Sequence, residues 1–203
     1  MGKKKDKKSK EVFLVIFVEG QTEEVFYKEI VEYIKKKNNN KATNLYKIKN
    51  LKGIGKFKSK MISIFKNSIM KKYLNYEVHV VCAYDTDVFE YSSNPPIKWS
   101  EKVKQLKEAG ASKVCLIGAK KMIEDWFLLD VLGICNFLKV KNTSNPKGKD
   151  GNKKMIDLFK RANKPYIKGE DTGEFIKVLD IEKIYKTKEE KLKCIEEILY
   201  KNK

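Results

Sequence analysis

Alternating blocks of apolar and polar residues run along the chain and predict a series of strands and helices. Val12–Val18 is an uninterrupted apolar run rich in β-branched residues, and Val78–Tyr84 is a second run of the same kind. Such runs are typical of strands that are buried on both faces of a parallel sheet. Two shorter runs, Leu45–Ile48 and Lys113–Ile117, predict two further strands.

Helical periodicity fills the gaps between these strands. After a turn at Glu19-Gly20-Gln21, apolar residues recur at i, i+4 and i+8, which predicts a helix with Thr22 as its N-cap that ends near Lys37. Further helices are expected at Phe57–Tyr73, from a Ser100 cap to Gly110, and at Met122–Leu132. This repeated strand–helix order predicts a doubly wound, Rossmann-like α/β fold whose mostly parallel sheet is flanked by helices.

The pattern loosens after Leu138. Residues 139–154 are rich in Lys, Asn, Gly, Ser and Pro and predict a long mobile loop. A helix at Lys153–Arg161, a short strand at Phe175–Leu179 and a capping box at Thr187–Glu190 before a last helix are expected to follow. We therefore expect a disordered basic arm at residues 1–10, an α/β domain at 11–138, and a basic loop with a helical C-terminal elaboration at 139–203, packed on the same domain.

Composition narrows the class of protein. The chain has 203 residues, of which 41% are hydrophobic, enough for the core of one domain. No apolar run approaches the ~20 residues of a membrane span, and the N-terminus lacks the apolar segment of a secretory signal. We therefore expect a cytoplasmic protein that is neither secreted nor embedded in a membrane.

Histidine and cysteine usage limits the chemistry. His79 is the only histidine, so one chain cannot supply a site that needs two or more histidines. The four cysteines are scattered without a C-x-x-C pair, which favours reduced thiols over a zinc site or a disulfide framework. Catalysis would have to use carboxylates, lysines and a hard metal ion.

The positive charge indicates a polyanionic partner. The formal net charge is +18, and residues 1–10 carry six lysines against one aspartate. Nucleic acid is the favoured partner because each neutralised phosphate releases counterions, whereas no helix is both basic and amphipathic enough to favour anionic lipid. Candidate contacts to the nucleic acid are Lys56, Lys120, Lys147, Lys149 and Lys153.

Acidic residues follow three of the predicted strands. Glu19 comes directly after the first, Asp85 and Asp87 after the third, and Glu124 lies just past the fourth. Ligands bind beyond the carboxyl ends of the strands in open α/β sheets, and Glu19 would join the aspartates if strands one and three are neighbours. Crowded carboxylates repel unless a cation neutralises them, and oxygen ligands suit Mg²⁺ or Mn²⁺. The alternative is that the aspartates only form a turn and that Glu19 is a surface residue.

Two motifs carry a resemblance to a known family: Val18-Glu19-Gly20-Gln21-Thr22-Glu23-Glu24, and Tyr84-Asp85-Thr86-Asp87 after an apolar strand. They resemble the Toprim domain, the metal-binding fold shared by topoisomerases, primases and the OLD (overcoming lysogenization defect) nucleases. Met122-Ile123-Glu124-Asp125-Trp126-Phe127-Leu128-Leu129 is similar to a segment of the small stand-alone OLD-like Toprim proteins of bacteria. The resemblance covers about residues 11–135.

The resemblance implies roles for individual residues. The family's first acid corresponds to Glu19, its Asp-x-Asp pair to Asp85 and Asp87, and the later acid of the OLD-like branch to Glu124. These acids would hold Mg²⁺ or Mn²⁺ for phosphodiester chemistry, and several such proteins act in phage defence. The chain contains no ATPase segment and no Walker A loop, so a separate ATPase partner stays open, as does a homodimer.

The resulting hypothesis is a divalent-metal-dependent nuclease that acts on DNA or RNA. The acids of the two motifs would bind one or two ions, and Glu124 would complete the second ion's shell or act as a base. Lys120 or Lys121 would offset charge on the scissile phosphate. Two alternatives remain: a non-catalytic nucleic-acid-binding module or subunit of a defence complex, and the processing of structured RNA.

Overall fold

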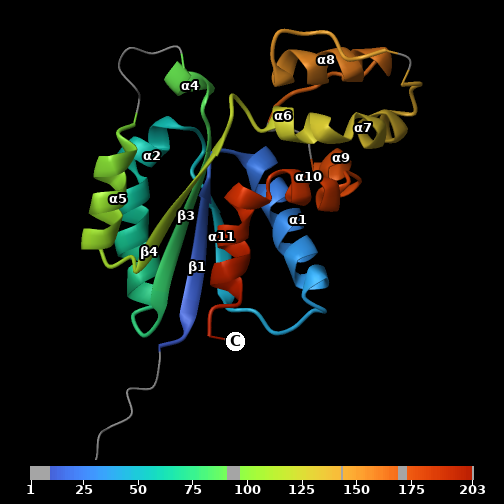
Figure 1. Ribbon diagram of the computed structural model, residues 1–203. Coiled ribbons are helices and arrows are strands. Elements are labelled where there is room, and N and C mark those ends of the chain that lie inside the picture. The colour runs from blue at the N-terminus through green and yellow to red at the C-terminus, as the bar shows by residue number, and fades with distance from the viewer. Residues whose placement is uncertain (1–9, 91–96, 143, 169–172, 203) are drawn as a thin grey trace, which may run out of the picture.

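A four-stranded, all-parallel sheet forms the centre of the molecule (Figure 1). The structure, a computed structural model, describes residues 10–90, 97–142, 144–168 and 173–202. The sheet has the order β2-β1-β3-β4, and its strands are β1 (Val12–Val18), β2 (Leu45–Asn50), β3 (Glu77–Asp85) and β4 (Lys113–Ala119). All four coincide with predicted strands, whereas the predicted arm at residues 1–10 lies almost wholly outside the described residues.

Helices cover both faces of this sheet. One face carries α1 (Gln21–Lys37) and α11 (Glu189–Leu199). The opposite face carries α2 (Gly55–Ser59), α3 (Met61–Ile64), the π-helix η1 (Phe65–Met70) and α5 (Trp99–Glu108). The chain thus winds both ways from β1, and the predicted doubly wound α/β fold with a parallel sheet is confirmed.

A second group of helices lies beyond the carboxyl ends of the strands, on the side of α1 (Figure 1). It consists of α6 (Glu124–Phe127), the 3₁₀ turn η2 (Leu128–Asp130), α7 (Val131–Leu138), α8 (Gly151–Arg161), α9 (Gly173–Lys177) and α10 (Ile181–Thr187). A short helix, α4 (Asp87–Glu90), follows β3. None of the helices in the described part of the chain has the length and hydropathy that a membrane crossing requires.

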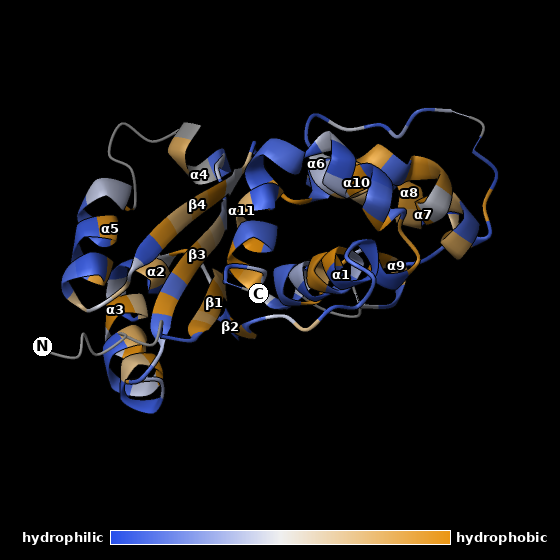
Figure 2. Cartoon of the chain, turned by 60° about the horizontal axis from the view of Figure 1, so that its bottom comes forward, coloured by the Kyte–Doolittle hydropathy of each residue, from blue (hydrophilic) through white to orange (hydrophobic). Residues whose placement is uncertain are grey.

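The strand sequences explain the two-sided core. Every side chain of β1 is buried: Leu14 and Ile16 pack on the α1 face, while Val15 and Phe17 pack on the α2–α5 face. Figure 2 shows the same contrast, with apolar strands between helices whose outward faces are hydrophilic. Trp126, only 2% exposed, belongs to the core as expected.

The cysteines and the histidine are also where the sequence places them. The four cysteines are free thiols, and Cys82 and Cys135 are buried. His79 is buried inside β3, and its Nε2 lies 3.0 Å from Glu77 Oε1. This histidine therefore supports the sheet, and it lies near the amino end of β3, away from the acids at the carboxyl ends.

One predicted strand is wrong. Phe175–Leu179 begins in α9, where Phe175, Ile176 and Leu179 are buried and Val178 is 52% exposed. Burial at i, i+1 and i+4 is helical spacing, whereas a strand would alternate. The segment packs against α1 as a helix because this spacing buries three apolar side chains on one side.

Helix boundaries and caps differ from the prediction at several points. The N-cap of α1 is Gly20, and Thr22 lies buried inside the first turn. Trp99 begins α5, one residue before the expected Ser100 cap, with its ring stacked on Tyr84 at 4.2 Å. Thr187 is no cap either, since its hydroxyl donates to the Lys183 carbonyl.

Two predicted helices are interrupted. The segment 57–73 is divided into α2, α3 and the π-helix η1. The segment 122–132 is divided at Asp130, whose carboxylate accepts hydrogen bonds from the N–H groups of Gly133 and Asp180 and so starts α7 as a new helix. In the predicted loop at residues 139–154, α8 already begins at Gly151, and Arg161 holds the preceding chain through the carbonyl of Ser144.

Candidate functional site

The candidate site lies where the winding of the sheet changes direction. β1 and β3 are parallel neighbours, with Phe17 opposite Cys82, so their carboxyl ends meet at one edge. Glu19 follows β1 directly, and Asp85 is the last residue of β3. In doubly wound sheets this switch point is where the connecting helices diverge and leave room for a ligand.

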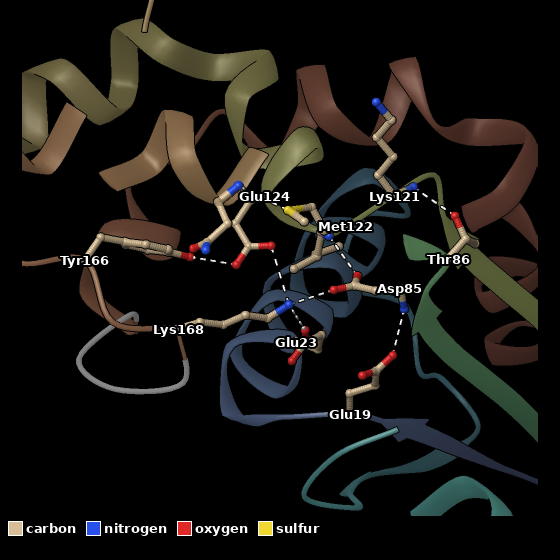
Figure 3. A network of polar contacts seen from close by, with 11 residues as sticks. Glu19, Glu23, Asp85, Thr86, Lys121, Met122, Glu124, Tyr166 and Lys168 are labelled. Carbon is tan, nitrogen blue, oxygen red and sulfur yellow. Dashed lines mark hydrogen bonds and ion pairs between the residues drawn. The ribbon is translucent and has the colours of Figure 1, made fainter. Parts of the chain in front are cut away.

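Backbone groups hold both acids in place. The carboxylate of Glu19 accepts a hydrogen bond of 2.8 Å from the Asp85 N–H. Asp85 in turn uses Oδ1 to accept a hydrogen bond of 2.8 Å from the Ile123 N–H, in the segment between β4 and α6. This chain of contacts joins the ends of three strands, so that the acids predicted from separate strands do meet (Figure 3).

The ammonium of Lys168 lies at the centre of the acids (Figure 3). Its Nζ is 2.6 Å from Asp85 Oδ2, 3.5 Å from Glu124 Oε2 and 3.7 Å from Glu23 Oε1. Tyr166 donates a hydrogen bond of 3.1 Å to the other oxygen of Glu124. Within the described residues, one cation thus serves three carboxylates at contact distance.

The carboxylates are buried and incompletely satisfied. Glu124 is 0% exposed, Glu23 3% and Asp85 4%. Both oxygens of Glu23 and Oε2 of Glu124 have no hydrogen-bond partner among the described residues, although Lys168 lies at ion-pair distance from one oxygen of each acid. Buried carboxylate oxygens normally have partners, so these three acceptors indicate capacity for a further cationic or donor group.

Gly20 makes room for the carboxylate of Glu23. A Cβ at position 20 would lie 2.9 Å from Glu23 Oε2, closer than carbon and oxygen normally approach. Gly20 has an extended backbone that any residue adopts, so the requirement is for space and not for conformation. The glycine of the Glu19-Gly20-Gln21-Thr22-Glu23 motif therefore leaves a recess that a side chain would fill.

Burial also sets the electrostatics of the site. It raises the pKa of Glu19 to about 7, against the opposing effect of the Asp85 N–H. Burial likewise raises the pKa of Glu23 and of Asp85, and Lys168 opposes both shifts. For Lys168, burial lowers the pKa, but Asp85, Glu124 and Glu23 outweigh it and the net pKa is raised. Burial thus favours the neutral form of these three acids, and a cation held among them would favour their charged form.

The donor set fits a hard divalent cation in chemistry. Its ligands would be carboxylate oxygens alone, which Mg²⁺ and Mn²⁺ prefer. As the side chains stand, no group of three or more acidic, cysteine or histidine residues in the described segments has the geometry to hold an ion. The Lys168 ammonium lies among the carboxylates instead, so an ion would have to share their oxygens with this lysine or displace it.

The other candidate residues at this edge of the sheet, Asp87, Lys120 and Lys121, lie in the connections that follow β3 and β4. Asp87 starts α4, and its N–H donates to the Lys121 carbonyl at 2.8 Å, which keeps it beside the site. The N–H of Lys121 donates to Thr86 Oγ1, while its side chain points away from Lys168 in Figure 3. Lys120 is exposed in the same connection.

Of the five lysines predicted to contact nucleic acid, Lys147, Lys149 and Lys153 lie in or beside the first turn of α8 and are exposed. Lys56 lies at the start of α2, on the other side of the sheet. The predicted contacts are thus divided between opposite faces of the sheet.

Sequence reasoning missed three residues of the site. Glu23 was detectable in principle, because it belongs to the Glu19-Gly20-Gln21-Thr22-Glu23 motif and lies in the first turn of the helix that follows Glu19. Tyr166 and Lys168 come from the irregular segment between α8 and α9. Nothing in the periodicity of that segment relates it to the strand ends.

Comparison with protein-family models, with curated proteins and with solved structures found no match to this chain.

Proposed function

We propose that the chain is a divalent-metal-dependent nuclease of the Toprim class, with its reaction centre at the carboxyl ends of β1 and β3. The observation that carries the proposal is the surplus of buried carboxylate at this point. Glu23 and Glu124 present three oxygens without hydrogen-bond partners among the described residues, beside Asp85 and a single ammonium. Buried carboxylates are costly unless they are paired or bind a cation, so this surplus favours a ligand site.

Glu19 and Asp85 are the proposed principal ligands, with Glu23 and Glu124 beside them and Asp87 assigned by the resemblance. A divalent ion bound by these acids would lower the pKa of a coordinated water and neutralise charge on a phosphate. The chain itself contributes preorganisation. Backbone N–H groups fix Glu19 and Asp85, and Tyr166 fixes Glu124, whereas Lys168 would have to move to admit an ion.

Lys168 is the proposed partner of the scissile phosphate. Its ammonium now neutralises the carboxylates, and its side chain is 41% exposed, so it can turn toward a ligand entering from solvent. An ammonium suits a phosphate oxygen as a point charge. We propose Lys168 for this role in place of Lys120 or Lys121, the residues that the sequence suggested.

The decisive test is cleavage of labelled DNA and RNA with Mg²⁺ or Mn²⁺, against an EDTA control. We expect products only with the metal, and we expect Glu19→Gln and Asp85→Asn to reduce the rate at least ~100-fold. Glu29→Gln, in the same helix as Glu23 but outside the site, is the matched control and should cleave as the wild type does. Equal cleavage by all four proteins would reject the proposal.

One observation favours a second candidate, a nucleic-acid-binding module without catalysis. Lys168 already pairs with Asp85 at 2.6 Å, as a permanently neutralised site would require. This candidate predicts retention of DNA or RNA that is unaffected by EDTA and gives no products over long incubation. The cleavage assay above separates the two.

A further inference from the structure

The positive charge of the chain is concentrated in one segment. Between Tyr33 and Tyr76 there are thirteen lysines and not one aspartate or glutamate. The formal net charge of the whole chain is +18, so this segment holds most of it. It folds into the end of α1, the strand β2 and the helices α2, α3 and η1.

Part of this segment lines an open groove between α1 and β2. The groove has a volume of about 700 Å³. Four lysines and one acid line it: Lys28 on α1, Lys47 and Lys49 on β2, Lys52 on the following turn, and Glu24. The local charge is therefore positive over the length of β2, which spans roughly 20 Å at ~3.3 Å per residue.

The groove continues into the candidate site. A second hollow of about 390 Å³ is lined by Glu19, Glu23 and Lys168. Gln21, Asn50 and Lys52 line both hollows, so the two are contiguous. A chain lying in the groove would therefore have the carboxylates close to its end.

Backbone contacts fix Lys52 at this junction. The N–H of Gly53 donates to the Glu19 carbonyl at 2.7 Å, and the N–H of Leu51 donates to the Val18 carbonyl at 2.9 Å. Lys52 itself has a φ of 62°, and its N–H donates to the side chain of Asn50. The turn that carries the lysine is thus attached directly to the turn that carries Glu19.

The lysines of this strand and turn are available to a ligand. β2 is an edge strand, and Lys47 and Lys49 line the groove from this edge, on the side of the sheet where Val15 and Phe17, their partners in β1, also lie. Neither of these two lysines, nor Lys52, forms an ion pair within the described part of the chain, whereas Lys35 and Lys37 nearby are paired with glutamates. The plain alternative is that lysines on an edge strand only prevent edge-to-edge association of sheets.

We propose that a nucleic-acid strand binds along the α1–β2 groove, with Lys47, Lys49 and Lys52 neutralising successive phosphates and Lys52 leading the backbone to the carboxylates. The inference rests on the proposed function for its direction, and it names the substrate path of that site. It places the main contacts on β2 instead of on α8, where Lys147, Lys149 and Lys153 were expected to bind. A concave groove favours a polymer backbone over the flat surface of a membrane.

The test compares two triple variants. K47Q/K49Q/K52Q removes three of the four groove lysines, those proposed to contact phosphates, and K147Q/K149Q/K153Q removes the same number of charges near α8. Binding of a fluorescein-labelled 20-nucleotide DNA single strand is measured by anisotropy in EDTA, between 50 and 200 mM salt. We expect the groove variant to bind ~10-fold or more weakly and to lower the slope of log K against log salt by about 2, since each phosphate contact contributes ~0.7 for a single strand. We expect less than a ~3-fold change for the α8 variant.

Equal losses in the two variants, or a larger loss in the α8 variant, would overturn the inference. Light scattering tests the edge-protection alternative, which predicts self-association of the groove variant with unchanged affinity. Anionic vesicles containing phosphatidylserine serve as a second probe, and preferential loss of vesicle binding would also contradict the proposal. Because binding is measured without metal, it is independent of cleavage. Binding in the groove without any cleavage would reject the nuclease activity but support the groove as the binding path. Cleavage with binding elsewhere would support the nuclease activity but reject the groove.

Discussion

Two charged clusters lie at opposite ends of the sheet. At the amino end of β3, Glu77 pairs with Lys201 at 2.6 Å and lies 3.0 Å from His79 Nε2. At the carboxyl end of the same strand, Asp85 pairs with Lys168 at the same distance of 2.6 Å. Both clusters therefore contain a lysine–carboxylate pair of identical length on one strand.

The pKa values of the acids in the two clusters are nevertheless shifted in opposite directions. The hydrogen bond from Lys201 lowers the pKa of Glu77, whose side chain is 28% exposed. Burial raises the pKa of Glu19, Glu23 and Asp85. The difference follows from burial and from stoichiometry, since one ammonium serves one carboxylate at the amino end and three at the carboxyl end. A balanced pair supports a fold, whereas an unbalanced buried group is typical of a site for a ligand.

Substitution of the lysine in each cluster tests the difference between the two clusters most directly. Lys168→Met leaves buried carboxylates without a cation and should lower the free energy of unfolding by about 2–3 kcal/mol in EDTA, a value reduced for the exposure of Lys168. That corresponds to a fall in Tm of about 4–12 °C for a chain of this size. Lys201→Met leaves Glu77, whose side chain is 28% exposed to water, and should cost less than ~1 kcal/mol. Thermal unfolding at pH 8 measures both.

Addition of Mn²⁺ to the same experiment tests whether the ion can replace the positive charge of Lys168. If the ion takes over the neutralising role of Lys168, adding Mn²⁺ should raise the Tm of Lys168→Met by more than it raises the Tm of the wild type. It should leave the difference between Lys201→Met and the wild type unchanged. A Lys168→Met variant as stable as Lys201→Met, or a smaller response to Mn²⁺, would contradict the picture of an under-neutralised site.

The half of the site that could be predicted comes from the strands. Val12–Val18 and Val78–Tyr84 are apolar throughout because both faces are covered, and parallel strands bring their carboxyl ends to one edge. The proximity of Glu19 and Asp85 follows from this when the two strands are neighbours. The order of the strands, with β1 next to β3, was the condition that the sequence left open.

The other half depends on tertiary contacts that local pattern does not encode. Lys168 and Tyr166 reach the site from an irregular segment, and their place there is set by packing of Tyr166 against Phe159 and Phe175. The same cause explains the missed helix at α9, whose apolar residues are consistent with either strand or helix until α1 is beside them. Asp130 likewise divides a predicted helix through a contact with Asp180, fifty residues away in the chain.

A smaller effect tests the carboxyl-end cluster through pH. The pKa of Glu19 is about 7 in the folded chain against an ordinary 4.5, so the folded state binds the proton more tightly than the unfolded state does. Stability contributed by this group is therefore present below pH 4.5 and lost as the pH rises through 7. Glu19→Gln, which keeps an acceptor for the Asp85 N–H, should be about 1–2 kcal/mol more stable than the wild type at pH 8 without metal.

The gain of Glu19→Gln should shrink toward zero at pH 4.5, as measured by urea unfolding at the two pH values. With Mn²⁺ at pH 8 the order should reverse, because the variant loses a charged ligand. A variant that is less stable than the wild type at pH 8 in EDTA would show that Glu19 is already fully neutralised by its neighbours.

The smallest effect belongs to the amino-end cluster and has the opposite sign. Because Lys201 lowers the pKa of Glu77, the charged form stabilises the folded state above pH 4.5, and this stabilisation is lost as the pH falls through the lowered value. Glu77→Gln should therefore cost less than ~1 kcal/mol at pH 7 and almost nothing in strong acid. His79, whose pKa is lowered by burial, stays neutral at pH 7 and does not mask the change. Urea unfolding of Glu77→Gln and Glu19→Gln at pH 7–8 in EDTA gives the two signs side by side. If both substitutions shifted stability in the same direction, the two ends of β3 would not differ in their balance of charge. That result would remove the argument that the buried acids form a ligand site.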